Sequence, residues 1–150
     1  MMPFEALTIC AKNQVRKTVK RFEATHLISL VDPHDRMPRP RRIERGNHLA
    51  MHFDDVADPS LPDAPQRDHL TRAIEWVDRL PETARLVVHC TAGISRSTAL
   101  SYALLRCSVP DQKTMAYVLR VRPEARPNAL MMRQVYAIHA TSGQWCNHKS

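Results

Sequence analysis

One stretch, LVVHCTAGISRSTAL at residues 86–100, constrains the fold more than any other part of this 150-residue sequence. Its first five residues form a short apolar run, typical of a strand buried on both faces of a parallel sheet. A turn around Gly93 follows, and after Ser95 apolar residues recur at helical spacing. The stretch therefore predicts a buried strand that leads through a tight turn into a helix.

The rest of the chain repeats this alternation of short apolar runs and longer amphipathic segments. We predict strands at 6–10, 26–31, 48–53 and 86–90, and helices at about 15–22, 66–80, 95–107, 110–122 and 127–140. Strands that alternate with helices predict an α/β fold, with a central, mainly parallel sheet of about four or five strands flanked by helices. The length and the ordinary apolar content of 43% favour a single domain over residues 1–150.

Composition also excludes several classes of protein. No stretch approaches the roughly 18 apolar residues of a membrane span, and the start lacks the pattern of a signal peptide. The four cysteines form no close pair, so we expect neither a zinc site nor a disulfide scaffold; they are Cys10, Cys90, Cys107 and Cys146. We therefore expect a cytoplasmic protein that binds no metal and no membrane.

The net charge of +7 leaves two interpretations of one arginine-rich loop open. Residues 36–45 contain five arginines, which are Arg36, Arg39, Arg41, Arg42 and Arg45. Such charge runs are usually solvated, but this one also suits a docking rim for a phosphorylated partner or a nucleic-acid backbone. Aromatic residues make up only 5% of the chain, which disfavours a nucleic acid held by base stacking.

The turn after the buried strand has the chemistry of an anion site. The first N–H groups of a helix have no partner within it, and the helix dipole adds positive potential there. Cys90 precedes this turn and Arg96 follows it, so we expect the pKa of the thiol to be lowered. The planar Arg96 guanidinium can grip two phosphate oxygens at once. A thiolate below a bound phosphate can attack phosphorus and form a phosphocysteine.

These nine residues, HCTAGISRS at 89–97, resemble the H-C-x-x-G-x-x-R-[S/T] signature of the protein tyrosine phosphatases. The flanking GISRSTAL and the short chain resemble the compact dual-specificity-like branch, whose cysteine phosphatase fold the resemblance implies. It also implies that Cys90 is the nucleophile, that Arg96 binds the phosphoryl oxygens, and that His89 orients the loop and keeps the thiol ionised. Ser97 would hydrogen-bond the sulfur as it leaves. The substrate phosphate would lie in the loop formed by Thr91, Ala92, Gly93, Ile94, Ser95 and Arg96.

The family also needs a general acid on a loop after an earlier strand. Matching the strand at 48–53 to the family assigns this role to Asp55, which lies 35 residues before Cys90. A shift of one residue would give it to Asp54, and this alternative stays open. We interpret Asp58 and Asp63 as turn-forming residues.

Asn128 and two departures from the family complete the prediction. Asn128, in RPNAL, would brace the catalytic loop or position water, or it is simply the N-cap of the last helix. The tyrosine-bearing recognition loop of large tyrosine phosphatases has no counterpart, which suggests a shallower cleft bounded by the arginine-rich loop. The turn also lacks the lysines of phosphoinositide-directed members, which disfavours a lipid substrate.

The resemblance thus implies a phosphatase that acts on protein phosphotyrosine, with phosphoserine and phosphothreonine left open, and that needs no cofactor. Two alternatives remain: an RNA 5′-triphosphatase of the same superfamily, and a non-catalytic module that binds phosphorylated partners. A low-pKa thiol would also be oxidised reversibly. Whether Cys10 or Cys107 could trap oxidised Cys90 stays open, as do the physiological substrate and the oligomeric state.

Overall fold

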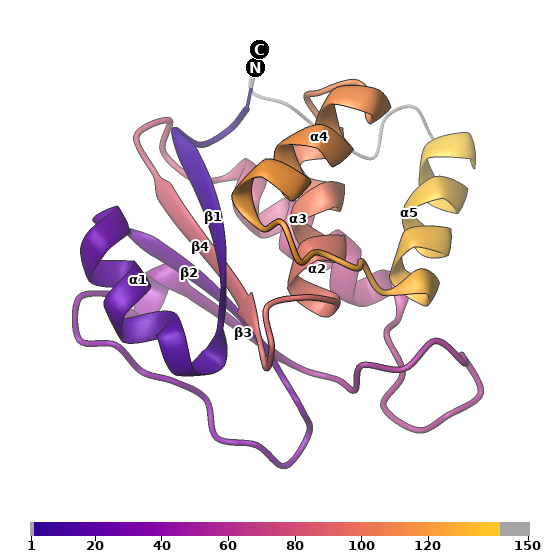
Figure 1. The fold of residues 1–150 in the computed structure, drawn as a ribbon, viewed down its shortest axis with the longest axis horizontal. Helices are drawn as coiled ribbons and strands as arrows, with labels where there is room; N and C mark the ends of the chain where they lie inside the picture. Colours follow the sequence, from indigo (N-terminus) through magenta and orange to yellow (C-terminus); the bar gives the residue numbers. More distant parts are fainter. Residues whose placement is uncertain (1, 142–150) are drawn as a thin grey trace.

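The structure, a computed structural model, describes residues 2–141 and shows a four-stranded sheet (Figure 1). The strands are β1 (Ala6–Ala11), β2 (His26–Val31), β3 (His48–His52) and β4 (Arg85–Cys90). Their order is β1-β4-β2-β3, and every pairing is parallel. The predicted α/β fold with a mainly parallel sheet is confirmed. Cys146 lies outside the described residues.

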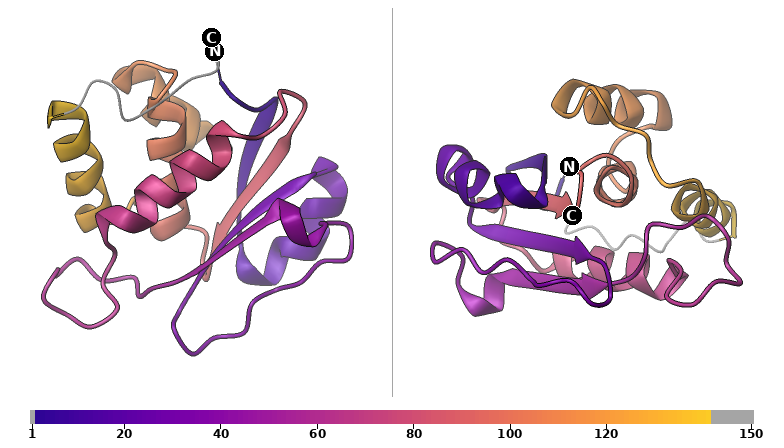
Figure 2. Two further views of the ribbon diagram at one scale, coloured as in Figure 1. Left: turned by 180° about the vertical axis from the view of Figure 1, so that it is seen from behind. Right: turned by 60° about the horizontal axis from the view of Figure 1, so that its bottom comes forward.

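Within the described residues, five α-helices cover the two faces of the sheet unequally (Figures 1 and 2). They are α1 (Val15–Phe22), α2 (Arg67–Asp78), α3 (Arg96–Arg106), α4 (Asp111–Val121) and α5 (Ala129–Thr141). Helix α1 lies on one face and the other four lie on the opposite face. Two short 3-10 helices, Lys12–Gln14 and Arg45–Asn47, were not predicted, because three residues are too few to show a period.

The period-2 geometry of the strands divides the core into two clusters. Val87 of β4 packs with Val15 and Val19 of α1, and Ile43 joins them from the loop between β2 and β3. Leu86 and Val88 face the larger cluster, which α2 to α5 cover. Within residues 2–141, no helix combines the length and the apolar character that crossing a bilayer requires.

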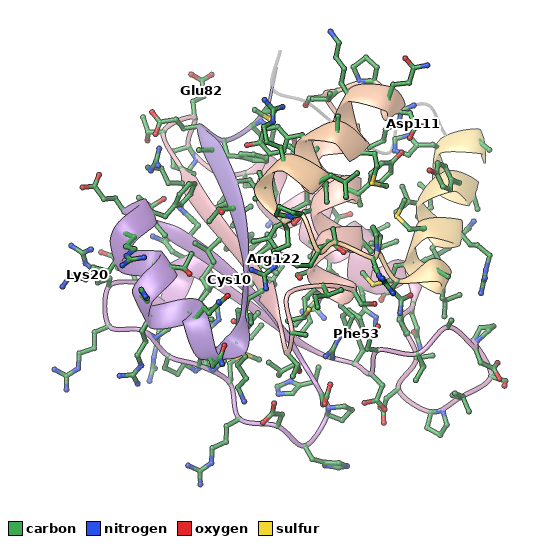
Figure 3. The ribbon with its side chains drawn as sticks, in the orientation of Figure 1. Cys10, Lys20, Phe53, Glu82, Asp111 and Arg122 are labelled. Atoms are coloured by element: carbon green, nitrogen blue, oxygen red, sulfur yellow. The ribbon has the colours of Figure 1, made fainter. Side chains whose placement is uncertain are left out.

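The parallel sheet determines where a site can form. The carboxyl ends of parallel strands meet at one edge of the sheet, and ligands of open α/β sheets bind beyond that edge. Here the loops after β2, β3 and β4 all leave from it. Figure 3 shows Phe53 toward this end of the molecule, whereas Glu82, which precedes β4, lies at the opposite end.

Candidate active site

The turn between β4 and α3 requires glycine at its centre. Gly93 has φ +70°, and a Cβ there would lie 2.6 Å from the carbonyl carbon and oxygen of Cys10 on the neighbouring strand. A larger residue would therefore be strained and would also collide with backbone atoms. The predicted tight turn thus depends on a close approach to the end of β1, which the sequence did not reveal.

The carbonyl groups of this turn are bonded on its outer side. Arg122, at the end of α4, donates from Nε to Gly93 O and from Nη2 to Ala92 O, both at 3.0 Å. The backbone N–H groups of Arg126 and Asn128 donate to Ile94 O and Ser95 O. Among the described residues, no backbone carbonyl accepts a hydrogen bond from the N–H groups of residues 92–95. These N–H groups are therefore available to an anion bound inside the turn.

Cys90 ends β4 at the base of this turn and is 2% exposed. Its Sγ lies 3.1 Å from the Ser97 Oγ. Burial, the largest single influence, raises the pKa of the thiol, but the Ser97 hydroxyl, the N–H groups of Ser97 and Gly93, and the Arg96 charge outweigh it. The pKa of Cys90 is therefore lowered. At Cys10, by contrast, burial dominates and raises the pKa to about 11.

Arg96 is held in one orientation although its side chain is only 3% exposed. Its Nη1 donates to Phe53 O at 2.6 Å and lies 2.8 Å from an Asp32 carboxylate oxygen, while Nη2 donates to Thr91 Oγ1 at 3.0 Å. The Nε atom is buried and has no hydrogen-bond partner. A buried guanidinium donor without an acceptor costs free energy, so the space beside Arg96 suits an oxyanion that would accept this hydrogen bond.

His89 braces the backbone of the nucleophile. Its Nδ1 lies 3.2 Å from Cys90 O, and its Nε2 lies 2.6 Å from the Ser29 Oγ on β2. Burial lowers the pKa of His89 to about 4, so the imidazole is neutral near pH 7. His89 therefore holds the loop through hydrogen bonds rather than through a charge. Nothing in the sequence pattern indicated Ser29 as its partner.

Asp55 and Asn128 meet above the turn. One carboxylate oxygen of Asp55 accepts hydrogen bonds from Ser95 Oγ at 2.6 Å and from Asn128 Nδ2 at 2.8 Å. The carbonyl oxygen of the Asn128 side chain accepts from Met131 N, as an N-cap residue does. Asn128 therefore caps α5 and also holds Asp55, while its role in bracing the catalytic loop or positioning water stays a prediction.

Of the other acidic residues of this loop, Asp58 and Asp63 lie in turns, as the sequence predicted, and Asp54 lies at the cavity. Asp58 accepts hydrogen bonds from the backbone and the hydroxyl of Ser60, which makes a local turn, and Asp63 has φ +58°. Asp54 lines the same cavity as Asp55, but within residues 2–141 its carboxylate makes no hydrogen bond to the catalytic loop.

These residues surround one cavity of about 510 Å³. Its lining comprises Asp32, Asp54, Asp55, Val56, Cys90, Thr91, Ala92, Ile94, Ser95 and Arg96. None of the five arginines of residues 36–45 is in this lining, so the expectation that their loop bounds the cleft is wrong. The start of the loop between β2 and β3 contributes Asp32 instead, because the later part of that loop, which contains the arginines, turns away toward α1. Asp32 follows a predicted strand, and the rule that sites form at carboxyl ends of strands would have indicated it.

Possible metal ligands are sparse in the described part of the chain. Among residues 2–141, no three His, Cys, Asp or Glu side chains converge in a way that would hold a metal ion. That the protein needs no cofactor stays a prediction.

Comparison with known proteins gives relatives of one kind, although no family model matches the chain. The dual specificity protein phosphatase MPK-4 of Drosophila melanogaster is 27% identical over 122 residues, and a probable dual specificity protein phosphatase of Dictyostelium discoideum is 24% identical over 126. The alignments cover 79% and 83% of this chain but 30% and 54% of those proteins. The chain thus spans about half of these relatives or less.

Solved structures share the fold. The crystal structure of DUSP15 matches with a TM-score of 0.71 and 24% identity, covering 96% of this chain and 89% of that one. The PTP-2 phosphatase of Cydia pomonella matches with a TM-score of 0.72 and 21% identity, covering 90% and 86%. At these identities the likeness concerns the arrangement of the strands and helices.

Proposed function

Because the chain is related, by sequence and by fold, to the dual-specificity branch of the protein tyrosine phosphatase superfamily, we propose that it is a cysteine-dependent phosphatase. Its proposed substrates are phosphate monoesters on protein tyrosine, with serine and threonine as further candidates. The single observation that carries the proposal is the buried, unpartnered Nε of Arg96, in the same cavity as a thiol of lowered pKa. A phosphate dianion would satisfy that donor and the N–H groups of residues 92–95.

The first step transfers the phosphoryl group to the cysteine. The Cys90 thiolate attacks phosphorus, the bond from phosphorus to the ester oxygen breaks, and Asp55 gives its proton to that oxygen. Phe53 O, Asp32 and Thr91 fix the guanidinium plane before substrate arrives. Arg96 therefore meets the developing charge without a cost of reorientation.

The second step returns the cysteine to its starting state. Asp55, now a carboxylate, takes a proton from water as the water oxygen attacks the phosphocysteine. The bond from sulfur to phosphorus breaks, and inorganic phosphate and the thiolate result. The Ser97 hydroxyl, 3.1 Å from Sγ, donates to the departing sulfur. Asn128 and Ser95 hold Asp55 over the turn in both steps.

The test is phosphate release by the wild type, by Cys90→Ser and by Cys10→Ser. The panel contains phosphotyrosine and phosphothreonine peptides, a phosphoinositide and triphosphate-ended RNA. We expect the fastest release from phosphotyrosine, at least a 10⁴-fold loss in Cys90→Ser, and near wild-type rates in Cys10→Ser. Cys10 is a matched control because it is also a buried free thiol, but one whose pKa is raised.

Other outcomes would select the alternatives. Faster release from triphosphate-ended RNA would replace the protein substrate with an RNA end. If the wild type bound phosphopeptides without releasing phosphate, the chain would be a phospho-binding module. Equal activity in Cys90→Ser would overturn the cysteine mechanism altogether.

The proposed chemistry also favours a reducing compartment. A thiolate that lines a cavity, as Cys90 does, can be oxidised to a sulfenic acid, which a thiol reductant reverses. We therefore keep the cytoplasm as the proposed location, and fractionation of cells that express the protein would test it.

A further inference from the structure

A second cavity lies on the other side of the loop between β2 and β3. It has a volume of about 400 Å³ and is lined by Arg39, Pro40, Ile43, Arg45 and His48. We call it the Arg39 pocket. Its lining combines two guanidinium groups and one imidazole with the apolar surfaces of Pro40 and Ile43, and it includes no carboxylate. None of its residues lines the catalytic cavity.

The surplus positive charge of the protein is concentrated around this pocket. Residues 12–47 contain ten of the 22 Lys and Arg residues but only four of the 15 Asp and Glu residues, so they carry +6 of the net charge of +7. Two of those four acids are already in ion pairs, Asp35 with Lys12 and Asp32 with Arg96. Arg42 ties the loop to α1 by donating to Lys20 O at 3.3 Å, so the loop and the basic helix α1 are neighbours. Figure 3 shows Lys20 of α1 pointing outward.

A chain of hydrogen bonds connects the pocket to the nucleophile. Arg39 Nη1 lies 3.0 Å from His48 Nδ1, and His48 Nε2 lies 2.8 Å from Ser29 Oγ. Ser29 is in turn bonded to His89, which is bonded to Cys90 O. The chain joins side chains of three neighbouring strands, which are His48 of β3, Ser29 of β2 and His89 of β4.

The donors and acceptors of this chain can be assigned without ambiguity. Cys90 O can only accept, so His89 Nδ1 carries the hydrogen and the neutral ring accepts at Nε2. The Ser29 hydroxyl therefore donates to His89, and its oxygen accepts from His48 Nε2–H. Only a neutral His48 leaves Nδ1 free to accept from Arg39, and burial together with the Arg39 charge lowers the pKa of His48 to about 4. All four bonds thus run in one direction, from Arg39 to Cys90.

We propose that the Arg39 pocket is a second oxyanion site, which binds phosphate either as the free ion or as the phosphate group of a phosphorylated side chain. We propose further that occupancy of this pocket is coupled to the catalytic loop through His48, Ser29 and His89. Two arginine forks suit the two charges of a phosphate monoester better than the single charge of a carboxylate. The site is distinct from the catalytic cavity, so its existence does not depend on the proposed activity.

Phosphate drawn into the pocket would compete with His48 Nδ1 for the Arg39 donor. Loss of that bond would free Nδ1 to take up a proton or water, and the His48 ring would settle into a new position. Ser29 and His89 would transmit the shift because each bond in the chain fixes the donor of the next.

Binding is tested by NMR titration of the ¹⁵N-labelled protein with inorganic phosphate, and in parallel with a phosphoserine peptide and its unphosphorylated form. The His48 ring nitrogens and the amides of 45–47 report the pocket, while the amides of 91–95 report the catalytic loop. We expect both groups to shift. In the double variant Arg39→Gln/Arg45→Gln, the pocket signals should show roughly tenfold weaker binding, and the loop signals should respond as before.

The matched control is Arg36→Gln/Arg41→Gln, which removes the same charge from the same loop but not from the pocket. It should weaken pocket binding by no more than about twofold. Equal weakening in both double variants would show diffuse attraction and overturn the site, as would phosphate shifts confined to residues 91–95. Tighter binding of inorganic phosphate or of the phosphopeptide would support a free anion or a docked phosphoprotein, respectively. Loss of hydrolysis with intact pocket shifts would refute the proposed function alone.

Coupling is tested where the catalytic cavity no longer binds phosphate, in Arg96→Met. Phosphate should then still shift the ring signals of His48 and His89. With Ser29→Ala added, the His48 shift should persist and the His89 shift should fall at least threefold, since the chain is cut between them. An unchanged His89 shift would overturn the coupling.

Discussion

Replacement of Asp55 by asparagine should remove the proton donor of the proposed reaction and little else. Its carboxylate oxygen accepts from Ser95 and Asn128, and an amide oxygen can accept the same two bonds. The residue is also exposed, so we expect the free energy of unfolding to change by less than about 1 kcal/mol. Any loss of rate in Asp55→Asn therefore reports proton transfer.

The expected size of that loss depends on the leaving group. General acid catalysis contributes roughly 10²- to 10⁴-fold, or about 3 to 5 kcal/mol of the barrier. We expect the upper part of this range for a phosphotyrosine peptide, because its phenolate leaves poorly without a proton. For nitrophenyl phosphate, whose leaving group is stable as an anion, the loss should be at least tenfold smaller.

Steady-state kinetics of Asp55→Asn and of Asp54→Asn provide the assay and its matched control. Both residues line the cavity, and the substitutions change charge and shape equally. Asp54→Asn should lose less than about tenfold in kcat, because no hydrogen bond among the described residues holds its carboxylate over the turn. A larger loss in Asp54→Asn would show that the general acid is one residue earlier. Equal losses with both leaving groups would refute proton donation by Asp55.

Three further predictions concern the catalytic loop and its supports. Ser97→Ala removes a hydrogen bond to the Cys90 sulfur. Stopped-flow traces should therefore show a product burst followed by turnover about 10- to 100-fold slower than in the wild type. Traces without a burst would contradict a role of Ser97 in phosphocysteine breakdown. Gly93→Ala should lower the free energy of unfolding by about 3 kcal/mol or more in urea titrations, because of the positive φ and the contact with Cys10; a smaller change would mean that the turn relaxes. The pKa of His89 falls from 6.5 to about 4 on folding, so the unfolded state binds more protons between these values and stability is complete above pH 6.5 but declines toward pH 4. Between pH 7.5 and 5, His89 alone contributes about 2 kcal/mol of this decline. The drop in His89→Asn should be smaller than the wild-type drop by that amount, and an equal drop would contradict the buried neutral imidazole.

The sequence predicted those parts of the site that local rules govern. The turn between a buried strand and a helix follows from residues 86–100, and the alternation of Leu49, Met51 and Phe53 determined which residues of β3 point inward. Phe53 is fully buried, and two residues later Asp55 reaches Ser95 and Asn128. The patterns of β3 and of residues 86–100 therefore indicated residues on two sides of the cavity.

The unpredicted contacts depend on how segments distant in sequence come together. Ser29 meets His89 because the register of β2 against β4 pairs these two residues, and a single strand carries no information about register. Arg122 reaches the carbonyls of the turn only because α4 ends beside it. The rule that sites form at the carboxyl ends of strands indicates Asp32 as a site residue, but the path of residues 32–47 has no period, so the sequence could not show that Arg96 would be its partner.

The loop between β2 and β3 thus has two ends with different partners. Asp32 at one end pairs with Arg96 in the catalytic cavity, and His48 at the other is bonded to Arg39 and Ser29. Between them, Ile43 anchors the loop in the cluster under α1, which leaves little freedom for one end to move alone. The arginines that the sequence suggested as a rim of the cleft are therefore held away from it. Their charge acts on the opposite side of the same loop, where the hydrogen-bond chain to Cys90 begins.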